Sequence, residues 1–353
     1  MALAEESRGV TWVAERVYAA VFVVVTLALL YWQFHGPNLA DWGGYGALYD
    51  RDGGWLASQG RDPLFVQLIH VSRTIFGGNG YDTFRAALFA VFLISAARAA
   101  YAMVPGKTWS IFLAVVVVAA FLIKSLVQVR EGLAFLLVLW PLVQTYRWGK
   151  SNLVLAGAFA LVAPFIHSGA ALFSGLWAMA AGLCLVPRIL MSTRLPWFFM
   201  FVGVALGVAA ARVLAGSASA LEFSLRDLGI DTNAEAVGGI AKYIYWIFMG
   251  VSVIIIGRQL VSAGKGSGRF GQALAISLGS LILPLIYTIC LVLVFRQFFL
   301  PAVTSMADRL LFSSMHLALL IIGLRGKVNS WSIGIAAFLI FDQIRLLFET
   351  PIF

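Results

Sequence analysis

The stretch "NLVLAGAFALVAPFIHSGAALFSGLWAMAAGLCLVP", residues 152–187, contains no Asp, Glu, Lys or Arg and is too long for one membrane crossing. As a single helix it would extend about 54 Å, whereas the hydrocarbon core of a bilayer is about 30 Å thick. Its only polar break lies between Pro164 and Ser168. We therefore predict two helices joined by a hairpin that contains His167.

A second long apolar run, residues 109–146, leads to the same conclusion. It would make a helix of about 57 Å, again longer than the bilayer core. The polar residues that interrupt it lie in "SLVQVREGLAFLL", residues 125–137, where Arg130 and Glu131 adjoin. An ionised residue near the hydrocarbon costs a few kcal/mol and is therefore usually paired or functional. We predict a second hairpin tip between Lys124 and Glu131.

The composition extends this pattern to the whole chain. The protein has 353 residues, of which 61% are hydrophobic and 12% charged, with a mean hydropathy of +0.92. These values are typical of an integral membrane protein. No hydrophilic stretch is long enough for a soluble domain, so we predict a single all-α domain over residues 1–353. The apolar runs predict eleven spans, centred on residues 17–34, 84–104, 109–123, 132–146, 153–166, 170–186, 196–214, 240–256, 273–294, 310–324 and 331–347.

Basic residues in the short connections predict how the chain crosses the membrane. They recur on alternate loops, which places the N-terminus in the cytoplasm and both hairpin tips on the outer side. Three longer outer segments remain, residues 35–81, 216–239 and 296–309. The first contains "PLFVQLIHVSRTIFGG", which is too short and too polar to span and predicts an amphipathic or re-entrant helix.

Arginines are concentrated on the predicted outer side. A guanidinium group suits bidentate binding of phosphate oxygens, so a diphosphate at the membrane surface is a natural ligand. Alternatively, these side chains extend to the interface from helix ends or pair with outer acids such as Asp50, Asp52, Asp62 and Asp308. The net charge of +9 does not indicate a nucleic-acid partner, because the basic residues divide between the loops and the outer face. The candidates for diphosphate binding are Arg51, Arg130, Arg212, Arg226, Arg296 and Arg309.

Two residues at the hairpin tips are candidate proton acceptors. His167 carries an imidazole, which can exchange a proton near neutral pH, and Glu131 carries a carboxylate. Each also has a structural interpretation, His167 as a helix-terminal residue bonded to a carbonyl and Glu131 as the partner of Arg130. No His, Cys or carboxylate cluster has metal-ligand spacing and no phosphate-binding Gly-x-x-x-x-Gly-Lys loop occurs. We therefore expect neither a metal nor a cofactor.

Four short stretches together resemble the EpsG-like branch of the Wzy-type bacterial polysaccharide polymerases. They are "DWGGYGALY" at residues 41–49, "RDPLF" at 61–65, "VREGLAFLL" at 129–137 and "FIHSGAALF" at 165–173. The third is similar to the family's Arg-Gln motif and the fourth to its His-Ser/Thr motif, in the same order and at similar spacing. One position departs from the family, because Glu131 stands where Gln is usual.

The resemblance implies a GT-C-like membrane enzyme at the outer face of the bacterial inner membrane. Such an enzyme moves a growing glycan from undecaprenyl diphosphate to the next lipid-linked repeat unit by metal-independent, inverting transfer. Its partners would be the lipid-linked donor and acceptor, membrane lipids and a chain-length regulator protein. Arg130, Glu131 and His167 would then be catalytic, while the first outer segment would bind substrate through Tyr45, Tyr49, Asp50, Arg51 and Arg61.

Three other functions share some of these features. A flippase for lipid-linked oligosaccharides should carry charges along a path through the bilayer, whereas the charges here gather on one face. A membrane acyltransferase could use a histidine but would normally take its donor from the cytoplasm, which an outward-facing His167 does not favour. An O-antigen ligase would share nearly all the features of the polymerase.

Overall fold

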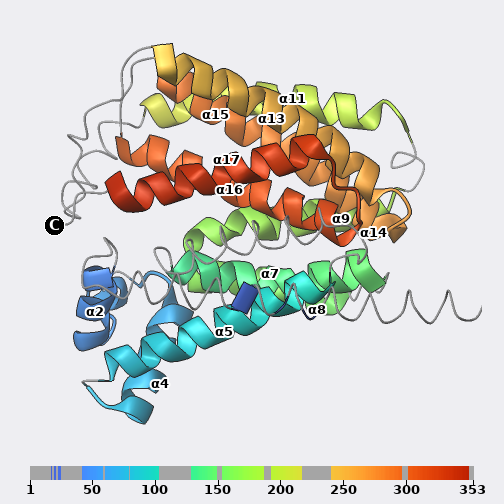
Figure 1. Ribbon diagram of the computed structural model, residues 1–353. Helices are drawn as coiled ribbons and strands as arrows, with labels where there is room; N and C mark the ends of the chain where they lie inside the picture. The colour runs from blue at the N-terminus through green and yellow to red at the C-terminus, as the bar shows by residue number, and fades with distance from the viewer. Residues whose placement is uncertain are drawn as a thin grey trace, which may run out of the picture. The chain divides into compact units, whose positions relative to one another are not determined.

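The computed structural model describes residues 42–58, 60–78, 80–102, 129–148, 153–186, 192–216, 240–295 and 301–349, together with residues 17, 20, 23 and 24 (Figure 1). Every element within these ranges is helical, which confirms the predicted all-α class. We predict one domain from the sequence, and the helices form two compact units. The first comprises residues Met1–Ala178 and Ile322–Phe353, and the second comprises Met179–Ile321.

The first unit holds the helices that carry the predicted hairpins. Helix α7 packs against both α5 and α8, and α4 contacts α3, α5 and α8. The elements are α2 (Trp42–Asp50), α3 (Gly54–Ser58), α4 (Pro63–Phe76), α5 (Tyr81–Ala102), α7 (Val129–Trp148), α8 (Leu153–Ile166), η1 (Ser168–Ala170), the first part of α9 (Ala171–Cys184), and α17 (Ser330–Glu349).

The hairpin predicted between Pro164 and Ser168 is confirmed. Helix α8 ends at Ile166, and His167 has an extended backbone with φ −152° and ψ 121°. Pro164 has no N–H, so it cannot donate to the carbonyl of Ala160 within α8. The hydroxyl of Ser174, on α9, donates to that carbonyl instead. The two arms of the hairpin are thus joined at the point where the proline leaves a backbone acceptor open. For the other hairpin, α7 begins at Val129 and the preceding residues lie outside the described ranges.

The second unit is a set of closely packed helices. Glycines allow α13 and the π-helical turn η2 to approach closely, since a Cβ on Gly257 would clash with the carbonyl oxygen of Gly279. Small residues at such crossings are typical of helix packing in membranes. The elements are α11 (Leu195–Gly216), α13 (Ile240–Gly264), α14 (Gly268–Ile276), η2 (Ser277–Ile282), α15 (Leu283–Phe295) and most of α16 (Pro301–Leu324).

Four described helices are long and apolar enough to cross a bilayer, namely Tyr81–Ala102, Leu195–Leu214, Tyr243–Gly264 and Gly268–Leu293. The protein thus has the helices of an α-helical membrane protein, but the predicted count of eleven spans is not supported. Helices such as Leu153–Ile166 are apolar but have 14 residues, about 21 Å against a core of about 30 Å. The spans predicted at 17–34 and 109–123 lie almost wholly outside the described residues.

The predicted outer segments have different outcomes. Residues 35–81 contain the short helices α2, α3 and α4, and the helix predicted in "PLFVQLIHVSRTIFGG" is confirmed as α4. Residues 217–239 lie outside the described ranges. Residues 301–309 of the third predicted outer segment form the first turns of α16. Pro301 starts that helix, a position where its fixed φ and missing N–H are well tolerated.

Candidate functional site

Asp62 has the least usual backbone and environment of the acidic residues that the structure describes. It precedes α4 in the left-handed conformation, with φ 48° and ψ 52°, a region that few residues other than glycine adopt. Aspartate at this position usually caps its own helix, but the side chain of Asp62 makes no cap hydrogen bond to α4. Its side chain is only 1% exposed. The carboxylate is therefore directed into the protein, away from the N-terminus of α4.

The carboxylate of Asp62 joins three segments that are far apart in the sequence. Nη1 of Arg130, in the first turn of α7, lies 2.5 Å from Oδ2. The backbone N–H of Ser168, at the turn between α8 and η1, donates to Oδ1 at 3.0 Å. One buried carboxylate thus contacts both the start of α7 and the turn between α8 and η1. We call Tyr45, Asp62, Arg130, His167 and Ser168 the Asp62 cluster.

His167 lies beside this carboxylate. Its Nδ1 atom is 3.8 Å from Oδ2 of Asp62, slightly beyond hydrogen-bond distance. Nδ1 is buried and has no hydrogen-bond partner among the described residues. On the other side of the ring, a Cβ added to Gly169 would lie 3.0 Å from Nε2. The imidazole is thus confined between the carboxylate of Asp62 and the backbone at Gly169.

The surroundings of Asp62 favour its ionised form. Burial alone would raise the pKa of its carboxyl, but the neighbouring His167 imidazole, the positive charge of Arg130 and the Ser168 N–H all lower it. Their sum leaves the pKa below its ordinary value. Asp62 is therefore an anion at neutral pH and would be a poor proton acceptor. It is better suited to orienting its neighbours.

The two tyrosines predicted to bind substrate have different environments. Tyr45 is half-buried, and Cζ of Arg130 lies 5.9 Å from the centre of its ring. Tyr49 is fully buried and stacks on Phe84 at 5.4 Å. Its hydroxyl donates to the carbonyl of Gly77 at 3.0 Å. Tyr45 thus belongs to the Asp62 cluster, whereas Tyr49 is placed as a core residue.

Glu131 follows Arg130 in the first turn of α7 and is 7% exposed. Adjacent residues on a helix do not face one another, so the two side chains leave α7 in different directions. The ion pair that the structure describes for Arg130 is with Asp62. Of the two predicted bases, His167 is therefore the one next to the buried carboxylate.

The other residues that we predict to bind substrate are spread over the chain. Asp50, Arg51 and Arg61 are exposed in the region of α2 to α4, and Arg61 directly precedes Asp62. Arg212 is exposed on α11 of the second unit. Arg309 lies in α16 with its side chain outside the described part, and Arg226 and Arg296 are also outside it. Of the catalytic and substrate-binding residues predicted from the sequence, the Asp62 cluster brings together Tyr45, Arg130 and His167 within the described part of the first unit.

Asp62 itself is the residue that sequence reasoning missed. The sequence predicts only that it is one of several acids able to pair with an arginine. An Asp-Pro pair at a helix start is an ordinary capping signal, so it gives no hint of a distant partner. The available signal was indirect, since "RDPLF", "VREGLAFLL" and "FIHSGAALF" each contribute one segment to the cluster.

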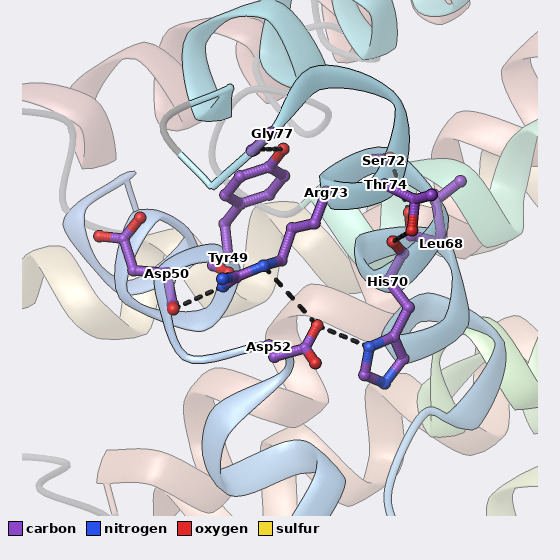
Figure 2. Close-up of polar contacts among 9 residues, drawn as sticks. All are labelled: Tyr49, Asp50, Asp52, Leu68, His70, Ser72, Arg73, Thr74 and Gly77. Carbon is purple, nitrogen blue, oxygen red and sulfur yellow. Dashed lines mark hydrogen bonds and ion pairs between the residues drawn. The ribbon is translucent and has the colours of Figure 1, made fainter.

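A second polar cluster holds the turn before α3 against α4 (Figure 2). Nδ1 of His70 lies 2.6 Å from Oδ1 of Asp52, and Nε of Arg73 lies 3.8 Å from the same oxygen. Nη1 of Arg73 donates to the carbonyls of Tyr49 and Asp50. These contacts join α2 and the turn after it to α4.

Two groups of the Asp62 cluster, the His167 imidazole and the Arg130 guanidinium, have complementary chemistry. An oriented imidazole can accept a proton, and a guanidinium can offset negative charge that develops on a leaving group. Among the described residues, no three His, Cys, Asp or Glu side chains lie close enough to share a metal ion. Comparison of the chain with protein-family models, with curated proteins and with solved structures gave no match.

Proposed function

We propose that the protein is a bacterial polysaccharide polymerase, which transfers a growing glycan from undecaprenyl diphosphate to the next lipid-linked repeat unit. The observation that carries the proposal is the Asp62 cluster. Three of the four stretches that resemble the EpsG-like family, distant in sequence, meet at one buried carboxylate. The fourth stretch contributes Tyr45. A shared site explains why these stretches occur together in one chain.

The reaction requires one bond exchange at the donor sugar. The acceptor hydroxyl oxygen forms a bond to C1 from the face opposite the leaving group, while the bond from C1 to the diphosphate oxygen breaks with its electron pair. The hydroxyl proton passes to Nε2 of His167, which acts as general base. The positive charge of Arg130, held in place by Asp62, offsets the charge on the departing diphosphate. Arg61, exposed beside Asp62, adds a second positive charge.

Asp62 acts through its neighbours in this scheme and is a positioning residue. As an anion beside Nδ1, it favours the imidazole tautomer with its proton on Nδ1, which leaves Nε2 as the acceptor. The same carboxylate fixes the direction of the Arg130 guanidinium. Glu131 is buried in the first turn of α7, and its proposed role is structural.

The proposed setting is the bacterial inner membrane, with the N-terminus in the cytoplasm and the Asp62 cluster facing the periplasm. The basic residues of alternate loops support this orientation. Lipid-linked donor and acceptor then reach the cluster from the outer leaflet, and a chain-length regulator is the expected protein partner.

The test is an assay of purified protein in liposomes that contain undecaprenyl diphosphate-linked repeat units. The wild type should convert them to a ladder of longer lipid-linked glycans. A single transfer to a different lipid acceptor would indicate a ligase, and movement of unchanged substrate across the bilayer would indicate a flippase. Either result would overturn the proposed polymerase.

A further inference from the structure

Helix α4 has a buried face that packs into the first unit. Phe65 and Ile69 are each 1% exposed, and Ser72 is also buried. They contribute to a core that includes Tyr49, Leu56 and Phe84. This face alone would make α4 an ordinary surface helix of a folded domain.

The same helix carries a second apolar face, which is exposed among the described residues. Leu64, Val71 and Ile75 are 40%, 53% and 67% exposed, and the partly buried Leu68 lies between them. These four residues follow the spacing i, i+4, i+7 and i+11, so they form one stripe within about 60° of the helix circumference. We call them the α4 stripe.

A polar face borders the stripe. Gln67 and Thr74 are exposed on it, and His70 lies between them with its Nδ1 atom turned to Asp52 (Figure 2). A helix with an exposed apolar stripe next to an exposed polar face is suited to the boundary between lipid and water. In water alone, the stripe would remain unfavourably hydrated.

The position of α4 places this stripe close to the bilayer. Its 14 residues extend about 21 Å, too short to span a core of about 30 Å. The segment Gly77–Gly80 connects it to α5, which is one of the helices able to cross the membrane. Five residue steps separate Phe76 from Tyr81, so the end of α4 lies at most about 18 Å from the start of α5.

We infer that α4 lies along the membrane surface, with the α4 stripe buried among bilayer lipids and its polar face directed to water. Because Asp62 directly precedes α4, the helix fixes the depth of the Asp62 cluster at the level of the lipid headgroups. The inference does not depend on the reaction that the cluster performs. It does give a reason why a site built around Arg130 would meet phosphate groups of lipids.

Spin labels can test this arrangement in the full-length protein, reconstituted in lipid bilayers with Cys184 and Cys290 replaced by Ala. One set of variants places a label on the stripe, using Leu64→Cys, Val71→Cys or Ile75→Cys. A matched set uses Gln67→Cys and Thr74→Cys on the polar face of the same helix. Collision with molecular oxygen reports exposure to lipid, and collision with a nickel chelate reports exposure to water.

Labels on the stripe should collide with oxygen rather than nickel and lie about 5 to 10 Å below the phosphates. Labels at Gln67 and Thr74 should show the reverse preference. Nickel access at the stripe equal to that at Thr74 would overturn the inference, because the stripe would then face water. Shielding from both reagents would also overturn it, since a protein surface such as a second copy would then cover the stripe.

Discussion

Asp62 combines a left-handed backbone with a buried negative charge, two features that each lower stability on their own. A strained backbone of this kind costs about 1 to 3 kcal/mol, and a buried charge is tolerated only when it is paired and hydrogen-bonded. Arg130 and the Ser168 N–H supply that pairing. Asp52 is the useful comparison, since it also has a positive φ, 55°, and a histidine partner. Its side chain, however, is 51% exposed.

Asp62→Asn removes the negative charge of the side chain and keeps its size, so it tests the contribution of the charge to stability. Asparagine tolerates the left-handed backbone but leaves Arg130 without its buried counter-charge, so we expect a loss of about 3 kcal/mol in the free energy of unfolding. Asp52→Asn makes the same chemical change at an exposed site and should alter stability little. Denaturant unfolding of both variants in detergent measures the difference. Equal stability of the two variants would show that the buried pair of Asp62 and Arg130 contributes no more to the free energy of unfolding than the exposed contacts of Asp52.

The lowered pKa of Asp62 predicts a pH dependence of stability. Its folded-state pKa lies below the unfolded value of about 4, so the ionised carboxylate stabilises the fold above that pH. The contribution is lost as the pH falls through the folded-state pKa. The stability difference between wild type and Asp62→Asn, measured from pH 7 down to about pH 2, should therefore shrink below about pH 4. A constant difference over this range would contradict the assignment.

The choice of base can be tested with one pair of substitutions. His167→Ala should lose at least about tenfold in polymer formation, because general-base catalysis contributes that much or more. Glu131→Gln restores the residue usual in the family and should keep substantial activity. Polymer yield at equal expression measures both. An inactive Glu131→Gln with an active His167→Ala would make Glu131 the general base in place of His167. If both variants are active, a phosphate oxygen or water accepts the proton of the acceptor hydroxyl.

At the scale of the elements, the hairpin of α8 and α9 depends on one hydroxyl. Ser174 donates to the Ala160 carbonyl that Pro164 cannot serve. Ser174→Ala should therefore cost about 1 to 3 kcal/mol of stability, the penalty for a buried unsatisfied carbonyl. Ser95→Ala is the matched control, because Ser95 donates to the carbonyl of Val91 on its own helix through a solvent-exposed hydrogen bond. Thermal unfolding should show a larger loss of stability for Ser174→Ala than for Ser95→Ala. Equal losses would show that the Ser174 hydroxyl does not stabilise the hairpin.

Some elements could be predicted from the sequence because a single physical limit decides them. The run at 152–187 exceeds the bilayer thickness, and its polar break is at Pro164 to Ser168, so the hairpin follows. The number of spans does not follow in this way. The core predicted at residues 153–166 coincides with the helix Leu153–Ile166, but hydropathy does not show whether a helix of about 21 Å crosses a hydrocarbon core of about 30 Å. The contact of Asp62 with Ser168 spans 106 positions and depends on α4 packing against α8, which no local pattern encodes.

At the scale of the whole molecule, the proposed orientation predicts opposite sides for the two ends of the site region. The loop before Asp62 should face the periplasm, and the loop after α7 the cytoplasm. Reporter insertions after Gly60 and after Lys150 should accordingly report periplasm and cytoplasm. The same side for both would mean that α7 and the helices before it do not cross the membrane as proposed.

In the proposed function, the Asp62 cluster is the reaction centre of a glycan polymerase. The most direct measurement is the liposome assay with lipid-linked repeat units, run on the wild type, Arg130→Ala, Asp62→Asn and Asp52→Asn at equal amounts of folded protein. We predict product ladders from the wild type and Asp52→Asn, and none from Arg130→Ala or Asp62→Asn. A wild type that makes no polymer would contradict the proposed function. Ladders of wild-type length from Arg130→Ala and Asp62→Asn would instead contradict the site.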